Sequence, residues 1–369
     1  MRIREAIAFV AVGGATALSM VPAQNAVASE TRQYAVYLSY PAMSNEEGDC
    51  KPSNPDSIGI LREGLRLQGK SSAEIEQAVD GVQRGDKRPD ISMRGKLEGK
   101  TVDAYLYPFS VPDSQLSLVQ GHVGIGFNLD GKDKPEDFVD PLTGERGVDN
   151  QLFRVLGCSR PWRAKIGEAG PYQLGKWEQT FESAPAWLID ISGIDSAEND
   201  DDVEVRVLLA KQPLARNALG TALAYLTFTA DPITRTAGNV VHGSIKNGRL
   251  TTGKFDFYLP SEPQKQAEYG LRDARMRFEF LPDGRLKGIV GGYQDWRPLY
   301  ITLALRRSVG EQSGSYDTPG HYYAFRKLAD AYPDPKTGQN MYISSAYYLE
   351  AVPAFIAYPE PSQQLTRAQ

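Results

Sequence analysis

The feature that most constrains the fold is a series of short, strand-like segments separated by turn residues. These segments occupy residues 33–40, 96–107, 187–191, 203–209, 222–229, 254–258, 275–280 and 285–290. Most of them alternate apolar and polar side chains, the period of two that turns one face of a strand towards a core. Asn247-Gly248 and Pro282-Asp283-Gly284 are hairpin signals between such segments. Strands at this spacing are typical of a sandwich or a barrel and not of βαβ units.

Composition favours the same class of fold. The chain has 369 residues, among them 19 Tyr, 35 Gly and 24 Pro. Aromatic residues suit strands, whereas Gly and Pro suit turns. We therefore predict a mainly β fold with a minor α+β character: an antiparallel β-sandwich or jelly-roll-like core with a few short helices. The best-defined helix begins at a capping box, Ser71 to Glu74, and continues with an apolar stripe.

The predicted organisation has four parts. They are a signal peptide over residues 1–28, a strand and helix lobe over 29–115 that packs on the core, a β-rich core over 116–358 and a disordered tail over 359–369. A chain of this length is long enough for one large domain or two ordinary ones.

The N-terminal segment predicts export. Arg2 and Arg4 precede an apolar run over residues 6–21, and residues 26–28 supply a cleavage site of the A-x-A type. A retained membrane anchor is the alternative, but glycine and hydroxyl residues interrupt a run that is already short of the about 20 apolar residues needed to span a bilayer. We expect cleavage near Ala28, a periplasmic or secreted location and no transmembrane segment in the mature chain.

The overall charge limits the classes of partner. The chain carries 41 Lys and Arg against 46 Asp and Glu, a net charge of −5. A mildly acidic, mixed surface gives no electrostatic footprint for nucleic acid, so we expect none to bind. The same balance argues against tight electrostatic binding to an anionic membrane.

The two cysteines, Cys50 and Cys158, predict a disulfide, because an even count in an exported chain is usually paired. Two free thiols in a reducing compartment are the alternative, which the export signal disfavours. No CxxC motif occurs, so thiol-redox and covalent haem functions have no support.

The stretch 121–158 combines an alternating segment with an acidic loop. The alternation predicts a half-buried strand with Val123, Ile125, Phe127 and Leu129 on its buried face. After the segment 122–130 the loop presents many oxygen ligands: Asp130, Asp133, Glu136, Asp137, Asp140, Asp149 and Asn150. Clustered carboxylates repel one another, and Ca²⁺ offsets such repulsion by taking about six to eight oxygens at flexible geometry. The sequence therefore predicts a calcium site, and its proposed ligands are Asp130, Asp133, Asp149 and Asn150.

This acidic loop has two other interpretations. An EF-hand register places Gly126 at position one and Asp137 at the last position, where the motif needs an acid and Glu, so an EF-hand does not fit. A solvated loop with Asx turns needs no metal at all. A second acidic cluster, residues 195–202, has the same solvated alternative.

Known catalytic motifs are absent from the sequence. His122, His242 and His321 are far apart, and no HExxH, GxSxG, P-loop or zinc spacing occurs. Paired carboxylates for glycan hydrolysis stay open, with Asp295 and Asp149 as candidates.

Two short motifs carry a family resemblance. Asn128-Leu129-Asp130-Gly131, followed by the sequence GVDNQ at residues 147–151, resembles a pattern in uncharacterised exported bacterial proteins. That resemblance implies export and no known activity.

The predicted function is that of an exported envelope protein, a non-catalytic binding or structural module with a calcium-stabilised loop. Its expected partner is a glycan or an envelope protein. The alternative is a secreted hydrolase of a glycan or another polymer, with carboxylates as acid and base.

Overall fold

The computed structural model describes residues 29–51, 54–89, 93–171, 181, 183–232, 239–259, 269–305 and 317–359. The predicted signal peptide and residues 360–369 of the predicted tail lie outside these residues. Eight strands of differing length form the main sheet: β1 (Glu30–Pro41), β6 (Pro185–Ile194), β7 (Asn199–Pro213), β9 (Val240–Lys246), β10 (Arg249–Thr252), β12 (Tyr269–Phe280), β13 (Leu286–Asp295) and β15 (Asn340–Ala357).

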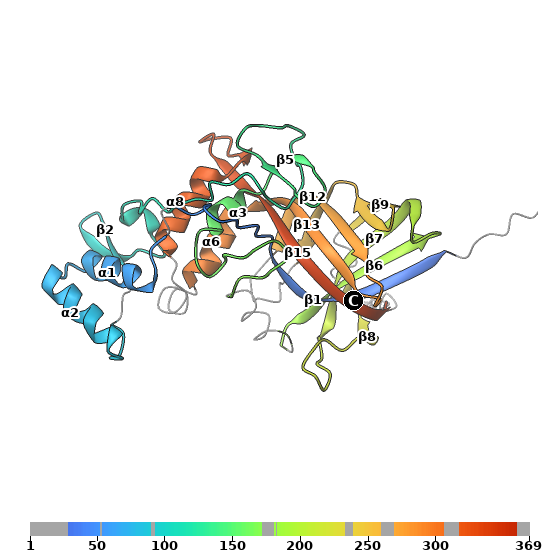
Figure 1. Ribbon diagram of the computed structural model, residues 1–369, viewed down its shortest axis with the longest axis horizontal. Helices are drawn as coiled ribbons and strands as arrows, with labels where there is room; N and C mark the ends of the chain where they lie inside the picture. The colour runs from blue at the N-terminus through green and yellow to red at the C-terminus, as the bar shows by residue number, and fades with distance from the viewer. Residues whose placement is uncertain are drawn as a thin grey trace, which may run out of the picture.

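These strands form a closed antiparallel barrel (Figure 1). Each pairs with the next in the order β1-β6-β7-β9-β10-β12-β13-β15, and β15 pairs back onto β1 from Tyr34↔Pro353 to Pro41↔Tyr347. The mainly β prediction is confirmed, but the predicted sandwich is wrong. Register shifts in β1 and β12 add the local bends that closure requires.

The barrel is filled by side chains. One apolar residue from each strand illustrates this interior: Tyr34, Ile189, Val205, Ile245, Leu250, Met276, Val290 and Leu349. An eight-stranded barrel is just wide enough for such side chains to fill it. Trp187 and Tyr269 stack inside it with ring centroids 5.2 Å apart. The interior is therefore a packed core and not a lumen.

Three short strands pair with strands of the barrel. β11 (Phe255–Leu259) pairs with β12, β14 (Ala331–Pro333) pairs with β15, and β8 (Leu226–Thr229) pairs with β15 in parallel.

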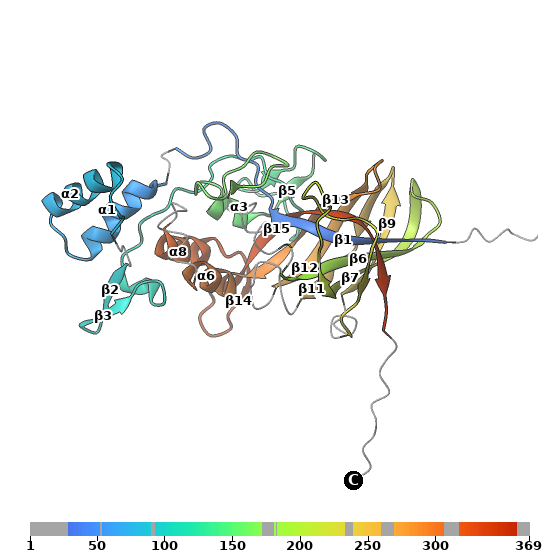
Figure 2. The ribbon, with the colours of Figure 1, turned by 90° about the horizontal axis from the view of Figure 1, so that it is seen from below.

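Helices cover one end of the barrel (Figure 2). α6 (Trp296–Leu305) follows β13 directly, and its Trp296, Leu299 and Tyr300 belong to the same apolar cluster as the barrel interior. α8 (Thr318–Leu328) packs against α6, and α3 (Gln151–Leu156) packs against α8 and β15. No helix among the described residues is long and apolar enough to cross a bilayer.

The elements farthest from the barrel come from the N-terminal third of the chain (Figures 1 and 2). They are α1 (Ser57–Leu67), α2 (Ser72–Gln83), β2 (Arg94–Leu97), β3 (Lys100–Asp103) and the 3-10 helix η1 (Pro108–Ser110). The capping box is confirmed: the Ser71 side chain accepts from the Glu74 amide, and Glu74 accepts from the Ser71 amide. Within the predicted 29–115 lobe, β1 is a strand of the barrel and the rest lies outside it.

Candidate functional site

The acidic stretch 121–158 lies against the outer wall of the barrel. Ile125, Phe127 and Leu129 are buried there against Ile289 and Tyr348. The prediction that these three residues share a buried face is therefore confirmed. The predicted strand is wrong, because this segment makes isolated bridges only, among them Phe127↔Asp149.

Two of the four predicted calcium ligands form ion pairs with basic side chains. Asp130 lies 2.7 Å from Lys134 Nζ, and the same distance separates Asp133 from Arg146 Nε. These basic side chains therefore offset part of the repulsion among the clustered carboxylates.

The other two predicted ligands hold backbone groups. Asp149 Oδ2 accepts from the amides of Leu129 (2.8 Å) and Asp130 (3.2 Å). Asn150 Oδ1 caps α3 by accepting from the Phe153 amide (3.1 Å). Asp149 is buried, and this burial raises the pKa of its carboxyl to about 6.

Two arginines of β12 fasten the acidic stretch to the barrel. Arg277 Nη2 is 2.5 Å from Asp140, a fully buried carboxylate, and Arg277 Nη1 is 3.4 Å from Glu145. Arg275 donates to the carbonyl of Asn128 (2.8 Å). Across the described ranges, no group of three or more His, Cys, Asp and Glu side chains is placed to hold a metal ion. Calcium binding by this loop stays a prediction.

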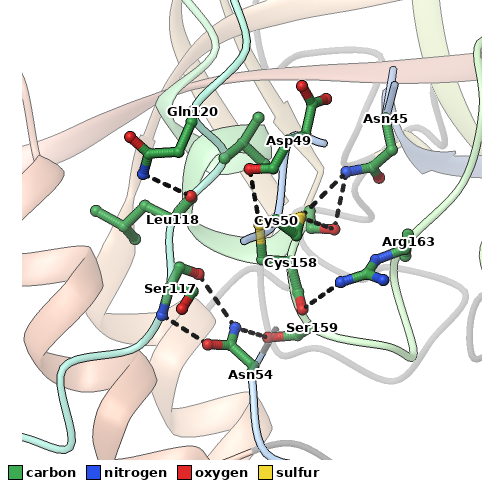
Figure 3. Close-up of a disulfide and its surroundings, with 12 residues drawn as sticks. Asn45, Asp49, Cys50, Asn54, Ser117, Leu118, Gln120, Cys158, Ser159 and Arg163 are labelled. Carbon is green, nitrogen blue, oxygen red and sulfur yellow. Dashed lines mark hydrogen bonds between the residues drawn. A yellow bond between two sulfur atoms is a disulfide. The ribbon is translucent and has the colours of Figure 1, made fainter. Parts of the chain in front are cut away.

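The predicted disulfide is confirmed (Figure 3). Cys50 and Cys158 are bonded and join the segment after β1 to the residues that follow α3. Asn54 supports the junction, because its Nδ2 donates to the Ser117 carbonyl and its Oδ1 accepts from the Ser117 amide. A disulfide indicates an oxidising, extracytoplasmic compartment.

The residue after the disulfide forms a serine–histidine pair that the sequence does not signal. Ser159 Oγ is 3.1 Å from His321 Nε2, and His321 Nδ1 is 2.6 Å from the Asp317 carbonyl. A carbonyl only accepts, so Nδ1 carries the proton and Nε2 accepts from Ser159. Burial lowers the pKa of His321, which keeps the ring neutral.

This pair has the tautomer of a general base but no access for a substrate. Ser159 is 1% exposed and His321 is fully buried, and neither lines either of the two cavities described below. The Ser159–His321 hydrogen bond links α8 to the segment that follows Cys158.

A cavity of about 310 Å³ opens where α6 meets the barrel. Its lining comes from β11, β12, β13, β15 and the start of α6: Asp256, Phe257, Tyr258, Gly270, Leu271, Arg272, Gln294, Asp295, Pro298 and Tyr342. We call this cavity the mouth pocket. Mouths of β-barrels are a common place for ligand sites.

The polar groups of the mouth pocket are held in fixed positions. The Arg272 guanidinium lies over the rings of Tyr332 (4.1 Å) and Tyr342 (5.5 Å) and forms no ion pair with any described residue. The Tyr347 hydroxyl donates to Gln294 Oε1, so the Gln294 amide nitrogen is the end that can donate to a ligand.

Of the two candidate hydrolase acids, only Asp295 lines the mouth pocket. Both of its oxygens accept hydrogen bonds from Arg297, at 2.9 and 2.5 Å. Asp256 is the second carboxylate here, and it accepts from the Asp273 amide (3.2 Å). The sequence hint for this site is the alternation of the predicted strands 254–258 and 275–280, but the second prediction starts after Arg272 and no pattern shows that the strands meet.

A second cavity, of about 510 Å³, lies between α1, α2 and residues 112–114. Its buried floor includes Ile60 and Ile75. Both arginines of its lining are paired with acids, Arg62 with Glu76 at 2.8 Å and Arg66 with Glu63 at 2.6 Å. Its other two acids, Asp113 and Asp317, accept hydrogen bonds from the backbone amides of Gln115 and Gly320. The arginines of this cavity are therefore already paired, whereas Arg272 of the mouth pocket forms no ion pair with a described residue, and we take the mouth pocket as the better candidate site.

Comparisons with known proteins give no relative: no family model, no curated protein and no solved structure matches this chain.

Proposed function

We propose that this is an exported, non-catalytic binding protein, periplasmic or secreted after removal of residues 1–28, whose mouth pocket binds a glycan. The observation that supports the proposal is the composition of that pocket. Aromatic side chains, a guanidinium, an amide and carboxylates converge on about 310 Å³ from rigid strands. A volume of this size is at the lower end of the about 300–1,000 Å³ of ligand pockets, so the ligand is small or is the end of a chain.

The chemistry of the lining fits a saccharide. A sugar ring has apolar C–H faces and a rim of hydroxyl groups. Tyr258 and Tyr342 offer apolar ring surface, while Arg272 and Gln294 donate and Asp256 accepts hydrogen bonds. Stacking on Tyr332 holds the Arg272 guanidinium before a ligand arrives, which lowers the entropy cost of binding.

Hydrolysis is the second candidate function, because two carboxylates, Asp256 and Asp295, share one pocket. Binding is favoured over it, since Arg297 engages both oxygens of Asp295 and this carboxylate is not placed to transfer a proton. Release of reducing ends from a bound oligosaccharide, lost in Asp295→Asn, would support hydrolysis.

The proposal is tested by saturation-transfer NMR of the mature protein with oligosaccharides from cellulose, chitin, starch and peptidoglycan. We expect at least one of these series to bind, and Arg272→Ala and Tyr258→Ala to weaken that binding about tenfold or more, which is at least 1.4 kcal/mol. The matched control is Arg249→Ala, an exposed arginine of β10 paired with Glu279 outside the pocket. No binding in any series, or equal losses in Arg272→Ala and Arg249→Ala, would contradict it.

A further inference from the structure

A hairpin between β7 and β8 carries exposed apolar side chains away from the barrel. The segment 213–225 projects beside β8 (Figure 1). Leu219 at its turn is 88% exposed, and Tyr225 is 64% exposed. Leu223 of the same segment and Phe355 of β15 are also exposed. The rings of Tyr225 and Phe355 lie 6.3 Å apart, and we call these four residues the apolar tip.

The turn of this hairpin satisfies its own backbone. Asn217 Oδ1 accepts from the amides of Leu219 (2.9 Å) and Thr221 (3.1 Å), and the Asn217 carbonyl accepts from the Gly220 amide (2.9 Å). Arg216 donates to the Gly220 carbonyl (2.7 Å). Such internal bonds favour a segment that reaches the boundary between headgroups and acyl chains, because an unpaired backbone group is costly where it meets hydrocarbon.

The charges around the apolar tip differ from those of the whole chain. Residues 211–230 contain Lys211 and Arg216 as their only charged residues, and residues 351–358 contain none. The chain as a whole has 46 acidic residues and a net charge of −5. The two segments that carry the tip are therefore free of acids, and Asp283, in the turn beside Tyr225, is paired with Arg285. Leu, Phe and Tyr in segments without acids match the interface of a bilayer, where tyrosine is enriched and carboxylates are costly.

A protein partner is a poorer fit to the apolar tip. Stable protein interfaces use about 20–30 residues a side, whereas the exposed apolar residues here are four, three on the projecting segment and Phe355 beside Tyr225 on β15. A projecting hairpin can enter a bilayer surface without moving the barrel.

From these observations we infer that the apolar tip inserts into the interface of a lipid bilayer and makes the protein a peripheral membrane protein. The contact is apolar, so it does not need anionic lipid and persists at high salt. This suits a chain whose own net charge is negative. This inference does not depend on the mouth pocket.

The test is flotation of the mature protein with phosphatidylcholine vesicles at high salt. We expect wild-type protein to float with the vesicles, and Leu219→Asp and Tyr225→Asp each to lower the partition coefficient about tenfold or more. Tyr225 has a φ of 61°, a conformation in which Asp is well tolerated, so this variant keeps its backbone. Leu106→Asp is the matched control, because Leu106 is 51% exposed in the lobe far from the tip.

A second measurement locates the contact. Leu219→Trp should show a blue-shifted emission change on adding vesicles and quenching by brominated lipid, and Leu106→Trp should show neither. Absence of flotation by wild-type protein overturns the inference, as does flotation that Leu219→Asp and Tyr225→Asp leave unchanged. Lipid-free dimerisation that Leu219→Asp abolishes would assign the tip to a second copy of the chain and would also overturn it.

Discussion

At the scale of single residues, buried polar pairs hold the acidic stretch to the barrel. Arg277 and Asp140 are the clearest case, with side chains 13% and 0% exposed. Removing one partner of such a pair leaves an uncompensated charge in a low-dielectric site, which is costly. The sequence could supply these acids as candidates, but it could not show that an arginine more than a hundred residues away neutralises them.

Arg277→Ala should lower the free energy of unfolding by about 3–5 kcal/mol, because Asp140 then stays buried without its partner. Arg249→Ala removes an arginine from an exposed pair with Glu279 and should change it by about 0–1 kcal/mol. Urea unfolding of both variants measures the difference. Equal effects would show that Asp140 finds another partner.

The Asp149 carboxyl predicts a pH dependence of stability. Its pKa is raised to about 6 in the folded protein, above the about 3.9 of an unfolded chain. The neutral acid is therefore favoured in the fold, and its stabilising contribution is present below the unfolded pKa and lost as pH rises through about 6.

Asp149→Asn can keep both amide hydrogen bonds on one oxygen, because both reach Oδ2 in the wild type. Relative to wild type, this variant should gain about 1–2 kcal/mol between pH 5 and pH 7.5, since one pKa unit corresponds to about 1.4 kcal/mol. Chemical unfolding at the two pH values, in a chelator, measures the gain. A difference that does not change with pH would contradict the raised pKa.

At the scale of elements, local patterns give the turns and helix ends, and long-range pairings give the fold. Asn247-Gly248 makes the predicted turn, with φ of 52° and 73°, as a type I′ turn requires. Alternation within strands is the same in a sandwich and in a barrel. The deciding contact is the pairing of β1 with β15, at opposite ends of the chain, and no local pattern encodes it.

The disulfide is the covalent link of this architecture. Replacing Cys50 and Cys158 together by Ala should lower the free energy of unfolding by about 2–5 kcal/mol, because the unfolded chain regains the entropy of a long loop. Thermal or urea unfolding of the double variant checks this. An unchanged free energy of unfolding would contradict a stabilising role of the disulfide.

The calcium prediction for the acidic stretch is tested by thermal unfolding in calcium and in EDTA. An ion that binds only the folded protein stabilises it by mass action, so the prediction requires a melting temperature several degrees higher in calcium. Identical curves would contradict the calcium prediction. The ion pairs of Lys134, Arg146 and Arg277 would then explain how the repulsion among these acids is offset.

At the scale of the whole molecule, the mouth pocket and the apolar tip lie towards opposite ends of β15. Tyr342 lines the pocket near the start of the strand, and Phe355 belongs to the tip near its end. At about 3.3 Å per residue the strand separates them by roughly 40 Å. A protein held on a membrane by its tip would therefore present the pocket away from the lipid surface.

This arrangement predicts that the two activities are independent. Leu219→Asp should leave saccharide affinity unchanged, and Arg272→Ala should leave vesicle flotation unchanged. Competition between vesicles and saccharide for the protein would contradict the separation of the two sites.

The site itself could not be read from the sequence, because its lining comes from five elements that only the closed barrel brings together. Asp295 is a sequence candidate on general grounds, whereas no sequence motif marks Arg272 or Tyr342.

The central claim, that the mouth pocket binds a glycan, is tested most directly by hydrogen–deuterium exchange of the mature protein with and without the tightest-binding oligosaccharide. We predict slower exchange in residues 256–258, 270–272 and 294–298, the segments that line the pocket, and no change in Arg272→Ala at the same concentration. Protection confined to the cavity between α1 and α2, or no protection anywhere, would contradict the claim.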